Sequence, residues 1–221
     1  MSTLSTDPRL PAAPPRVVAF SGILFASFYI ASLVLVRLAV PADPADPGVW
    51  LADPSFRNGV RFALNLVPFT GLAFLWFMAV LRNRMGQRED RFFATVFLGS
   101  GLLFVAMLFT AVGVAQALLD TFGTDTGMPA RSETYIVGRR LAYSLMHTFG
   151  VRMEAVFMFA TSTIGFRTEV LSRWVSFVGF ACGLVLLVVI TDFAWIALIF
   201  PGWVLLVSAW ILIADFRQRS P

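Results

Sequence analysis

The 221-residue chain contains no lysine, one cysteine and one histidine, and each of these shortages excludes a class of function. All 17 basic residues are arginine, so no Schiff base can form on a lysine amine, which excludes a retinal-type pigment. The single cysteine, Cys182, cannot form a disulfide within the chain, and no CxxC motif exists. With one histidine, a four-ligand protein metal site or a bis-histidine haem is excluded within one chain. We therefore expect no bound metal and no cofactor.

Catalytic sequence motifs are also missing. The chain has no glycine-rich phosphate loop and no Ser-His-Asp ordering. The missing motifs exclude several classes of enzyme, and no motif that is present supports one. The isoelectric point near 10.2 reflects arginines in the loops between apolar segments, so it does not indicate a nucleic-acid partner.

Long apolar segments dominate what the sequence does contain. Apolar side chains make up 58% of the chain and the mean hydropathy is +0.79, which is typical of an integral membrane protein in a lipid bilayer. About 20 apolar residues cross a bilayer as a helix. The sequence predicts an all-α, polytopic membrane helix bundle with six transmembrane helices, over Val17–Val36, Phe62–Leu81, Phe92–Leu119, Leu141–Phe166, Trp174–Ile190 and Ala194–Ala214. This single domain, 16–215, lies between predicted tails at 1–15 and 216–221.

The distribution of arginine predicts the orientation of the bundle. Six spans place both termini on one side of the membrane, and arginine is enriched on the cytoplasmic side of membrane proteins. One side would hold ten arginines against six on the other: Arg9, Arg16, Arg82, Arg84, Arg88, Arg91, Arg167, Arg173, Arg217 and Arg219. We therefore expect both termini in the cytoplasm and the protein in the plasma (inner) membrane.

Two helix starts carry local signals. Asp53 followed by Pro54 is typical of an N-cap and a first helical residue. Ser132 is a second candidate N-cap, for a long helix that enters the membrane as the fourth span.

The stretch Arg140–Arg167 carries ionisable residues inside a membrane-length apolar run. At 100° per residue, steps of seven return to nearly the same helix face, so Arg140, His147, Glu154 and Thr161 are predicted to share one polar seam, with Tyr143 and Ser144 beside it. Arg152 is rotated by about 200° from Glu154, so the two charges cannot pair within their own helix. Each needs a partner elsewhere.

Glu154 and Arg152 each have a functional and a structural interpretation. Glu154 either carries a proton or binds a cation, or it fixes helix packing through hydrogen bonds. Arg152 either extends to water or binds an acceptor. One solution is a homodimer through the fourth span, in which Arg152 of one chain meets Glu154 of the other.

The remaining candidates are polar residues in the predicted outer half of the bundle. Asn65 and His147 either bond to a neighbouring helix or line a polar pocket, with Tyr143 and Ser144 as further candidates. The same outer half holds Tyr29, Ser32, Thr110, Gln116, Thr191 and Asp192. This bias predicts a polar pocket that opens outward, with Glu154 at its floor.

Two segments carry a resemblance to known sequences. They are VGRRLAYSLMHTFGVRMEAVFMFATSTIGFRT, Val137–Thr168, and PGWVLLVSAWILIADFR, Pro201–Arg217. The chain resembles a group of multi-pass bacterial membrane proteins that is best represented in GC-rich actinobacteria. The resemblance covers the C-terminal half better than the N-terminal half, and it implies the architecture without implying an activity.

Three functional hypotheses remain. The first is a helix bundle that binds or transports a small ligand, a proton or an ion through the pocket around Glu154, Arg152 and His147. The second is a non-catalytic accessory or assembly subunit of a larger membrane complex. The third is a membrane enzyme that acts on a lipid or isoprenoid, with Glu154 as a general acid.

Overall fold

The computed structural model describes residues 15–41, 43, 46, 48–85, 91–123, 132–188 and 195–219. Over these residues the chain is all helical, without strands. The long helices are α1 Pro15–Ala39, α2 Pro54–Met85, α3 Arg91–Phe122, α4 Glu133–Ser144, α5 Val151–Arg167, α6 Arg173–Val188 and α7 Ile199–Arg219. Short 3₁₀ helices cover η1 Val49–Ala52 and η3 Ile196–Leu198, and the π-helical segment η2 Leu145–Gly150 joins α4 to α5.

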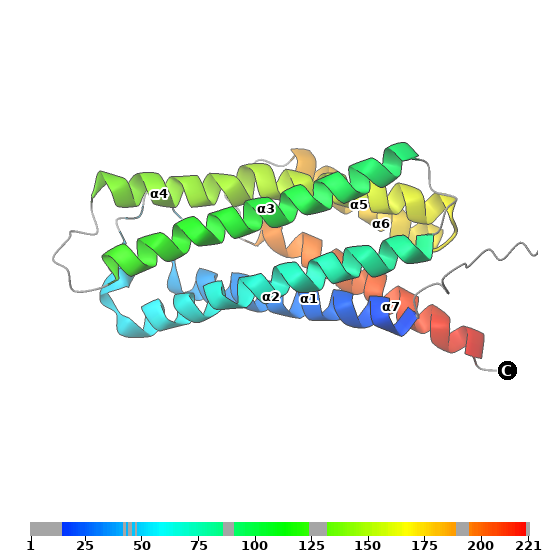
Figure 1. Cartoon of the computed structure of the whole chain (residues 1–221), viewed down its shortest axis with the longest axis horizontal. Helices are drawn as coiled ribbons and strands as arrows, with labels where there is room; N and C mark the ends of the chain where they lie inside the picture. The colour runs from blue at the N-terminus through cyan, green and yellow to red at the C-terminus, as the bar shows by residue number, and fades with distance from the viewer. Residues whose placement is uncertain are drawn as a thin grey trace, which may run out of the picture.

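The helices lie alongside one another along the long axis of the molecule, and α4, η2 and α5 form one uninterrupted helical run (Figure 1). Helix α1 packs mainly against α2 and α7, while α5 packs mainly against α6 and α3. The start of α1 and the end of α7 meet at one end of the bundle, where Arg16 Nε lies 3.7 Å from Asp215 Oδ2. We call this the arginine end, because each long helix run has an arginine here: Arg16, Arg84, Arg91, Arg167, Arg173 and Arg217.

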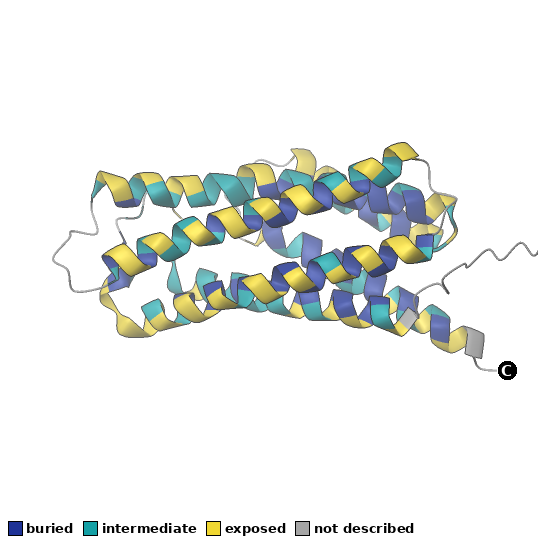
Figure 2. Cartoon of the chain, viewed as in Figure 1, coloured by how far each residue is buried: buried dark blue, intermediate teal, exposed yellow. Residues whose placement is uncertain are grey.

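Four helical segments are long and apolar enough to cross a bilayer, which indicates a membrane protein: Arg16–Ala39, Pro54–Met85, Arg91–Phe122 and Ile196–Arg217. The surfaces of the helices that face away from the bundle are largely exposed, and the surfaces that face inward are buried (Figure 2). Large apolar side chains such as Phe62, Phe69 and Trp76 occur on the exposed surfaces. This is the pattern expected where lipid replaces water as the solvent.

The two local start signals are confirmed. Asp53 Oδ1 accepts a hydrogen bond from the Ser55 N–H at 2.8 Å, with Pro54 as the first residue of α2. Ser132 Oγ accepts one from the Tyr135 N–H at 3.2 Å at the start of α4. Because of the first cap, α2 begins well before the predicted Phe62 and extends beyond the apolar segment.

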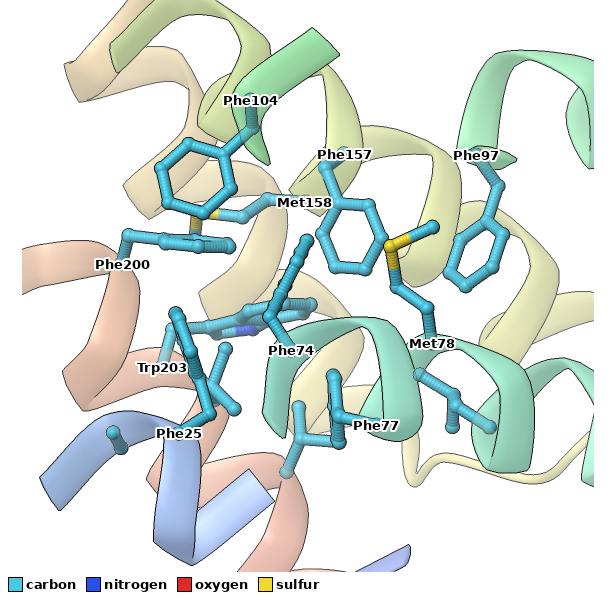
Figure 3. Close-up of a cluster of buried hydrophobic side chains, with 14 of the residues drawn as sticks. Phe25, Phe74, Phe77, Met78, Phe97, Phe104, Phe157, Met158, Phe200 and Trp203 are labelled. Carbon is cyan, nitrogen blue, oxygen red and sulfur yellow. The ribbon is translucent and has the colours of Figure 1, made fainter. Parts of the chain in front are cut away.

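Aromatic side chains fill the middle of the bundle. The Phe74 ring centroid lies 4.9 Å from Phe25, 5.2 Å from Phe104, 5.1 Å from Phe157 and 5.7 Å from Phe200. All five rings are fully buried and come from α1, α2, α3, α5 and α7 (Figure 3). We call them the aromatic block. The Phe74 pairs with Phe104 and Phe200 are edge-to-face, and such ring pairs stabilise packing beyond the area that they bury.

Glycines allow close approach on the arginine side of the aromatic block. A methyl group on Gly22 of α1 would overlap the Ser208 hydroxyl of α7, and one on Gly179 of α6 would overlap the Ser162 hydroxyl of α5. Gly183, one turn beyond Gly179, faces the backbone of Ala155. Small residues at membrane helix contacts let backbones approach, and here these contacts lie within one bundle.

Replacing Gly22 with alanine is therefore expected to destabilise the bundle by about 1 kcal/mol through overpacking against Ser208 and the Phe77 ring. Thermal unfolding in detergent measures the effect. Gly113→Ala is the matched control, because a methyl group there meets no atom within 4 Å and alanine favours the helix. Equal stability changes for the two variants would contradict the packing argument.

Candidate functional site

The buried carboxyl of Glu154 is hydrogen-bonded to a tyrosine from a distant part of the chain. Tyr29 Oη of α1 donates to Glu154 Oε1 of α5 at 2.8 Å, and both side chains are at most 1% exposed. The other oxygen, Oε2, has no hydrogen-bond partner among the described residues. Buried polar groups are normally paired, so a half-satisfied carboxyl in the middle of a helix bundle marks a candidate site.

The aromatic block lies directly beside this pair. Tyr29 stacks on Phe25 at 5.5 Å and meets Phe104 edge-on at 5.8 Å. Phe157 follows Glu154 by one turn of α5 and belongs to the block as well. The pair therefore lies on one side of a closed aromatic layer.

A cavity of about 210 Å³ lies on the other side of the Tyr29–Glu154 pair. Its volume equals that of about seven water molecules, at about 30 Å³ each. Tyr29 is its deepest residue on α1, and we refer to it as the floor. The walls come mainly from α1, α2, α3, α4 and η2, and they include Ser32, Leu33, Val36, Arg37, Leu64, Val67, Leu108, Ala111, Arg139, Tyr143, Met146, His147, Val151 and Ala197.

A cluster of Arg37, His147 and Tyr143 forms the polar part of the wall. Arg37 Nη2 lies 2.9 Å from His147 Nε2, and Tyr143 is also a hydrogen-bond partner of the Arg37 guanidinium. The Tyr143 and His147 rings stack at 3.9 Å with an interplanar angle of 7°. Because arginine can only donate, Nε2 is the acceptor, so His147 is neutral in this arrangement and its ring proton is on Nδ1.

Arg139 holds the connection between α1 and η1 against α4. Its guanidinium donates to Asp46 Oδ1 at 2.9 Å and to the carbonyls of Pro41 and Asp43, both at 2.7 Å. Asp46 Oδ1 also accepts from the Gly48 N–H at 2.8 Å. Arg139 also lines one side of the cavity. It does so as part of an ion pair, in which Asp46 balances its positive charge.

The predicted site residues separate into two groups. Glu154 is buried under the floor, and His147 and Tyr143 line the cavity. Ser144 is half-buried outside the wall, and Asn65 is exposed on the outer surface of α2 although its neighbour Leu64 lines the cavity. The predicted polar residues Thr191 and Asp192 lie outside the described residues.

Arg152 turns back onto its own helix. Its Nη1 donates to the carbonyl of Thr148 at 2.6 Å and to that of His147 at 3.4 Å, both in η2. This satisfies carbonyls in the irregular π-helical turn and removes the need for a partner chain. Glu154 is fully buried inside its own chain, so its carboxylate is not exposed for a reciprocal pair with Arg152 of a second copy. A homodimer through other contacts stays a prediction.

The π-helical segment also shifts the predicted polar seam. Glu154 and Thr161 share the buried side of α5 as expected, but Arg140 is exposed and Arg139 lines the cavity instead. The Val151 N–H bonds to the carbonyl of Met146, five residues back, which inserts one extra residue into the helix turn. The seam therefore moves by one position on the α4 side.

Comparisons with protein-family models, with curated proteins and with solved structures gave no match. The sequence did not mark Arg37 and Arg139 as site residues. It marked Tyr29 only as one of several polar residues in the predicted outer half of the bundle. Nothing in the local sequence marks these three, because each gains its role from a side chain on another helix.

Proposed function

We propose that this chain is a six-span plasma-membrane bundle, with both termini cytoplasmic, that binds a small ligand in the cavity and exchanges protons at Glu154. The observation that carries the proposal is the Tyr29–Glu154 pair at the cavity floor, with Glu154 Oε2 left without a hydrogen-bond partner by the described residues. An ionisable group at membrane depth beside a cavity is typical of proton and substrate pathways.

The fifth and sixth spans of this proposal come from the continuous run α4–η2–α5 and from α6. Residues 133–167 rise about 52 Å at 1.5 Å per residue, which exceeds the 30 Å hydrocarbon core. Helix α6, Arg173–Val188, covers about 24 Å by the same measure. Helix α6 is therefore about 6 Å shorter than the core, and the proposed sixth crossing also requires residues that follow Val188 in the sequence. With that extension and the four long apolar segments, the proposal has six crossings.

The depth of the cavity follows from the arginine end. About 20 residues cross the hydrocarbon core. Counting this length from the arginine in five of the helix runs reaches a cavity residue each time: Arg16 to Val36, Arg84 to Leu64, Arg91 to Ala111, Arg167 to His147 and Arg217 to Ala197. With the arginine end in the cytoplasm, the cavity lies at the outer boundary of the hydrocarbon core.

The aromatic block gives the site one accessible side. Closely packed aromatic rings lie between Glu154 and the arginine end, and the cavity lies between Glu154 and the outer boundary. A proton that reaches Glu154 from the cavity passes the Tyr29 hydroxyl, which can donate and accept at the same time. In this proposal, passage to the other side requires the aromatic block to open, and the closed block belongs to the outward-facing half of a transport cycle.

Proton flux into liposomes tests this function. Wild-type protein and the Glu154→Gln variant are reconstituted with a trapped pH-sensitive dye, and a membrane potential is imposed. We expect wild-type protein to acidify the lumen faster than protein-free liposomes, and Glu154→Gln to reduce the rate to the protein-free level. Gln keeps the shape and an acceptor for Tyr29 but cannot release a carboxyl proton.

Asp215→Asn is the matched control, because Asp215 is the other buried carboxylate of the described chain and lies at the arginine end beside Arg16. It should retain the flux. If wild-type protein and protein-free liposomes acidify equally, proton exchange is not the function. Reproducible purification of the wild-type protein with a larger membrane complex would then favour an accessory subunit.

A further inference from the structure

We propose that the ligand of this cavity is a monoanion on a short apolar chain, with its carboxylate or phosphate head on Arg37 and its chain directed toward Tyr29. This inference rests on the proposed function and names its substrate class. It follows from the charge, the polarity and the length of the cavity.

Arg37 supplies an unmatched positive charge. Among the described residues no carboxylate lies within 4 Å of its guanidinium, and its partners His147 and Tyr143 are uncharged side chains. Arginine cannot lose its charge in a protein, and half-buried charges are normally paired. An anion in the cavity would complete the pairing that the chain itself leaves open.

The other described wall residues add no competing negative charge. None of them is Asp or Glu, and the second arginine among them, Arg139, is already paired with Asp46 at 2.9 Å. Among the described wall residues, Arg37 therefore supplies the unpaired charge. Arginine presents five N–H donors in a planar fork that matches carboxylate and phosphate oxygens, and the contact to His147 uses one side of that fork.

Below Arg37 the described wall is mainly apolar, and the Ser32 hydroxyl on this part of α1 donates to the Ala63 carbonyl at 3.1 Å. Leu33 and Val36 separate Arg37 from Tyr29 on α1, and Val67, Leu108 and Val151 face them from α2, α3 and α5. From Arg37 to Tyr29 the helix descends about 12 Å, at 1.5 Å per residue. A volume of about seven waters over this depth fits an elongated molecule of about seven non-hydrogen atoms, such as pentanoate.

Titration of purified protein in detergent with three probes of equal length tests the assignment. The probes are pentanoate, pentan-1-ol and pentylammonium, and the readouts are calorimetric binding and the shift in thermal unfolding. We expect pentanoate to bind wild-type protein at least about tenfold tighter than the alcohol, and pentylammonium to bind weakest, since a hydrogen-bonded charge at Arg37 discriminates between them.

Arg37→Gln should remove this preference, and Arg37→Lys should retain part of it because the charge stays and the fork is lost. Arg140→Gln is the matched control: the same residue type at the same end of the bundle, but exposed and outside the wall. It should leave all three affinities unchanged.

Equal affinities for the three probes would overturn the anion assignment and leave the cavity as a site for apolar ligands. Binding of no probe, with proton flux intact, would overturn the ligand class without touching proton exchange at Glu154. Nanodiscs distinguish the source of the head group. If pentanoate binds in phosphatidylcholine nanodiscs but not in phosphatidylglycerol nanodiscs, the anionic lipid competes for Arg37 and the site is assigned to a lipid head group. If pentanoate binds in both, the site is assigned to a free monoanion.

Discussion

Replacing Arg139 with glutamine is expected to lower the free energy of unfolding by about 3 kcal/mol. The Arg139 and Asp46 side chains are only 11% and 16% exposed, and the guanidinium also holds the carbonyls of Pro41 and Asp43. Removing the cation leaves a largely buried carboxylate and two carbonyls without their donor. Thermal unfolding in detergent measures the loss.

Arg140→Gln provides the comparison for this prediction, because the adjacent arginine is exposed. It should change stability by less than about 0.5 kcal/mol. Asp46→Asn should destabilise the protein in the same direction as Arg139→Gln, and the double variant should lose less than the sum, since the two residues share one ion pair. Losses that add in full would show that the pair is not coupled.

The helical class and the helix starts follow from the sequence because their causes are local. Apolar length marks the long segments, and the Asp53 and Ser132 caps depend on residues two or three positions away. The apolar span predicted from Phe62 is shorter than α2, which begins at Pro54 as its cap predicts, because apolar length detects the hydrocarbon core and the helix continues past it.

The faces of the helices could not be predicted in the same way. In a soluble bundle, polar residues mark the outside of a helix, but in a membrane both the lipid-facing and the core-facing sides are apolar. The sequence therefore predicts that Asn65 either bonds to a neighbouring helix or lines the pocket, whereas it is exposed on α2. A polar residue at this depth indicates that its side chain has a polar partner or environment, but the sequence does not show which helix or cavity that side chain contacts.

The π-helical turn explains the shift from Arg140 to Arg139. A period of seven residues assumes a regular α-helix, and Leu145–Gly150 breaks that assumption by one residue. Glu154 and Thr161 keep their predicted common side because both follow the irregular turn. Arg152 then finds acceptors at the carbonyls of His147 and Thr148, an arrangement that spacing arguments did not anticipate.

Tyr29→Phe is expected to destabilise the bundle by about 2 kcal/mol, because it leaves the Glu154 carboxyl buried without its described donor. Glu154→Gln should cost less, since the amide oxygen still accepts the Tyr29 hydroxyl hydrogen. Tyr143→Phe is the control, as the same hydroxyl is removed from a half-buried tyrosine in the cavity wall.

The double variant Tyr29→Phe with Glu154→Leu distinguishes a pairing from two independent contributions. Replacing both partners by apolar groups removes the unsatisfied carboxyl as well as the hydrogen bond, so the double variant should be at least as stable as Tyr29→Phe alone. Such a result, together with lost proton flux, would mean that the pair is retained for function at a cost in stability. A double variant less stable than Tyr29→Phe alone, with proton flux retained, would instead make Glu154 a structural contact, and proton exchange would have to be assigned to another group.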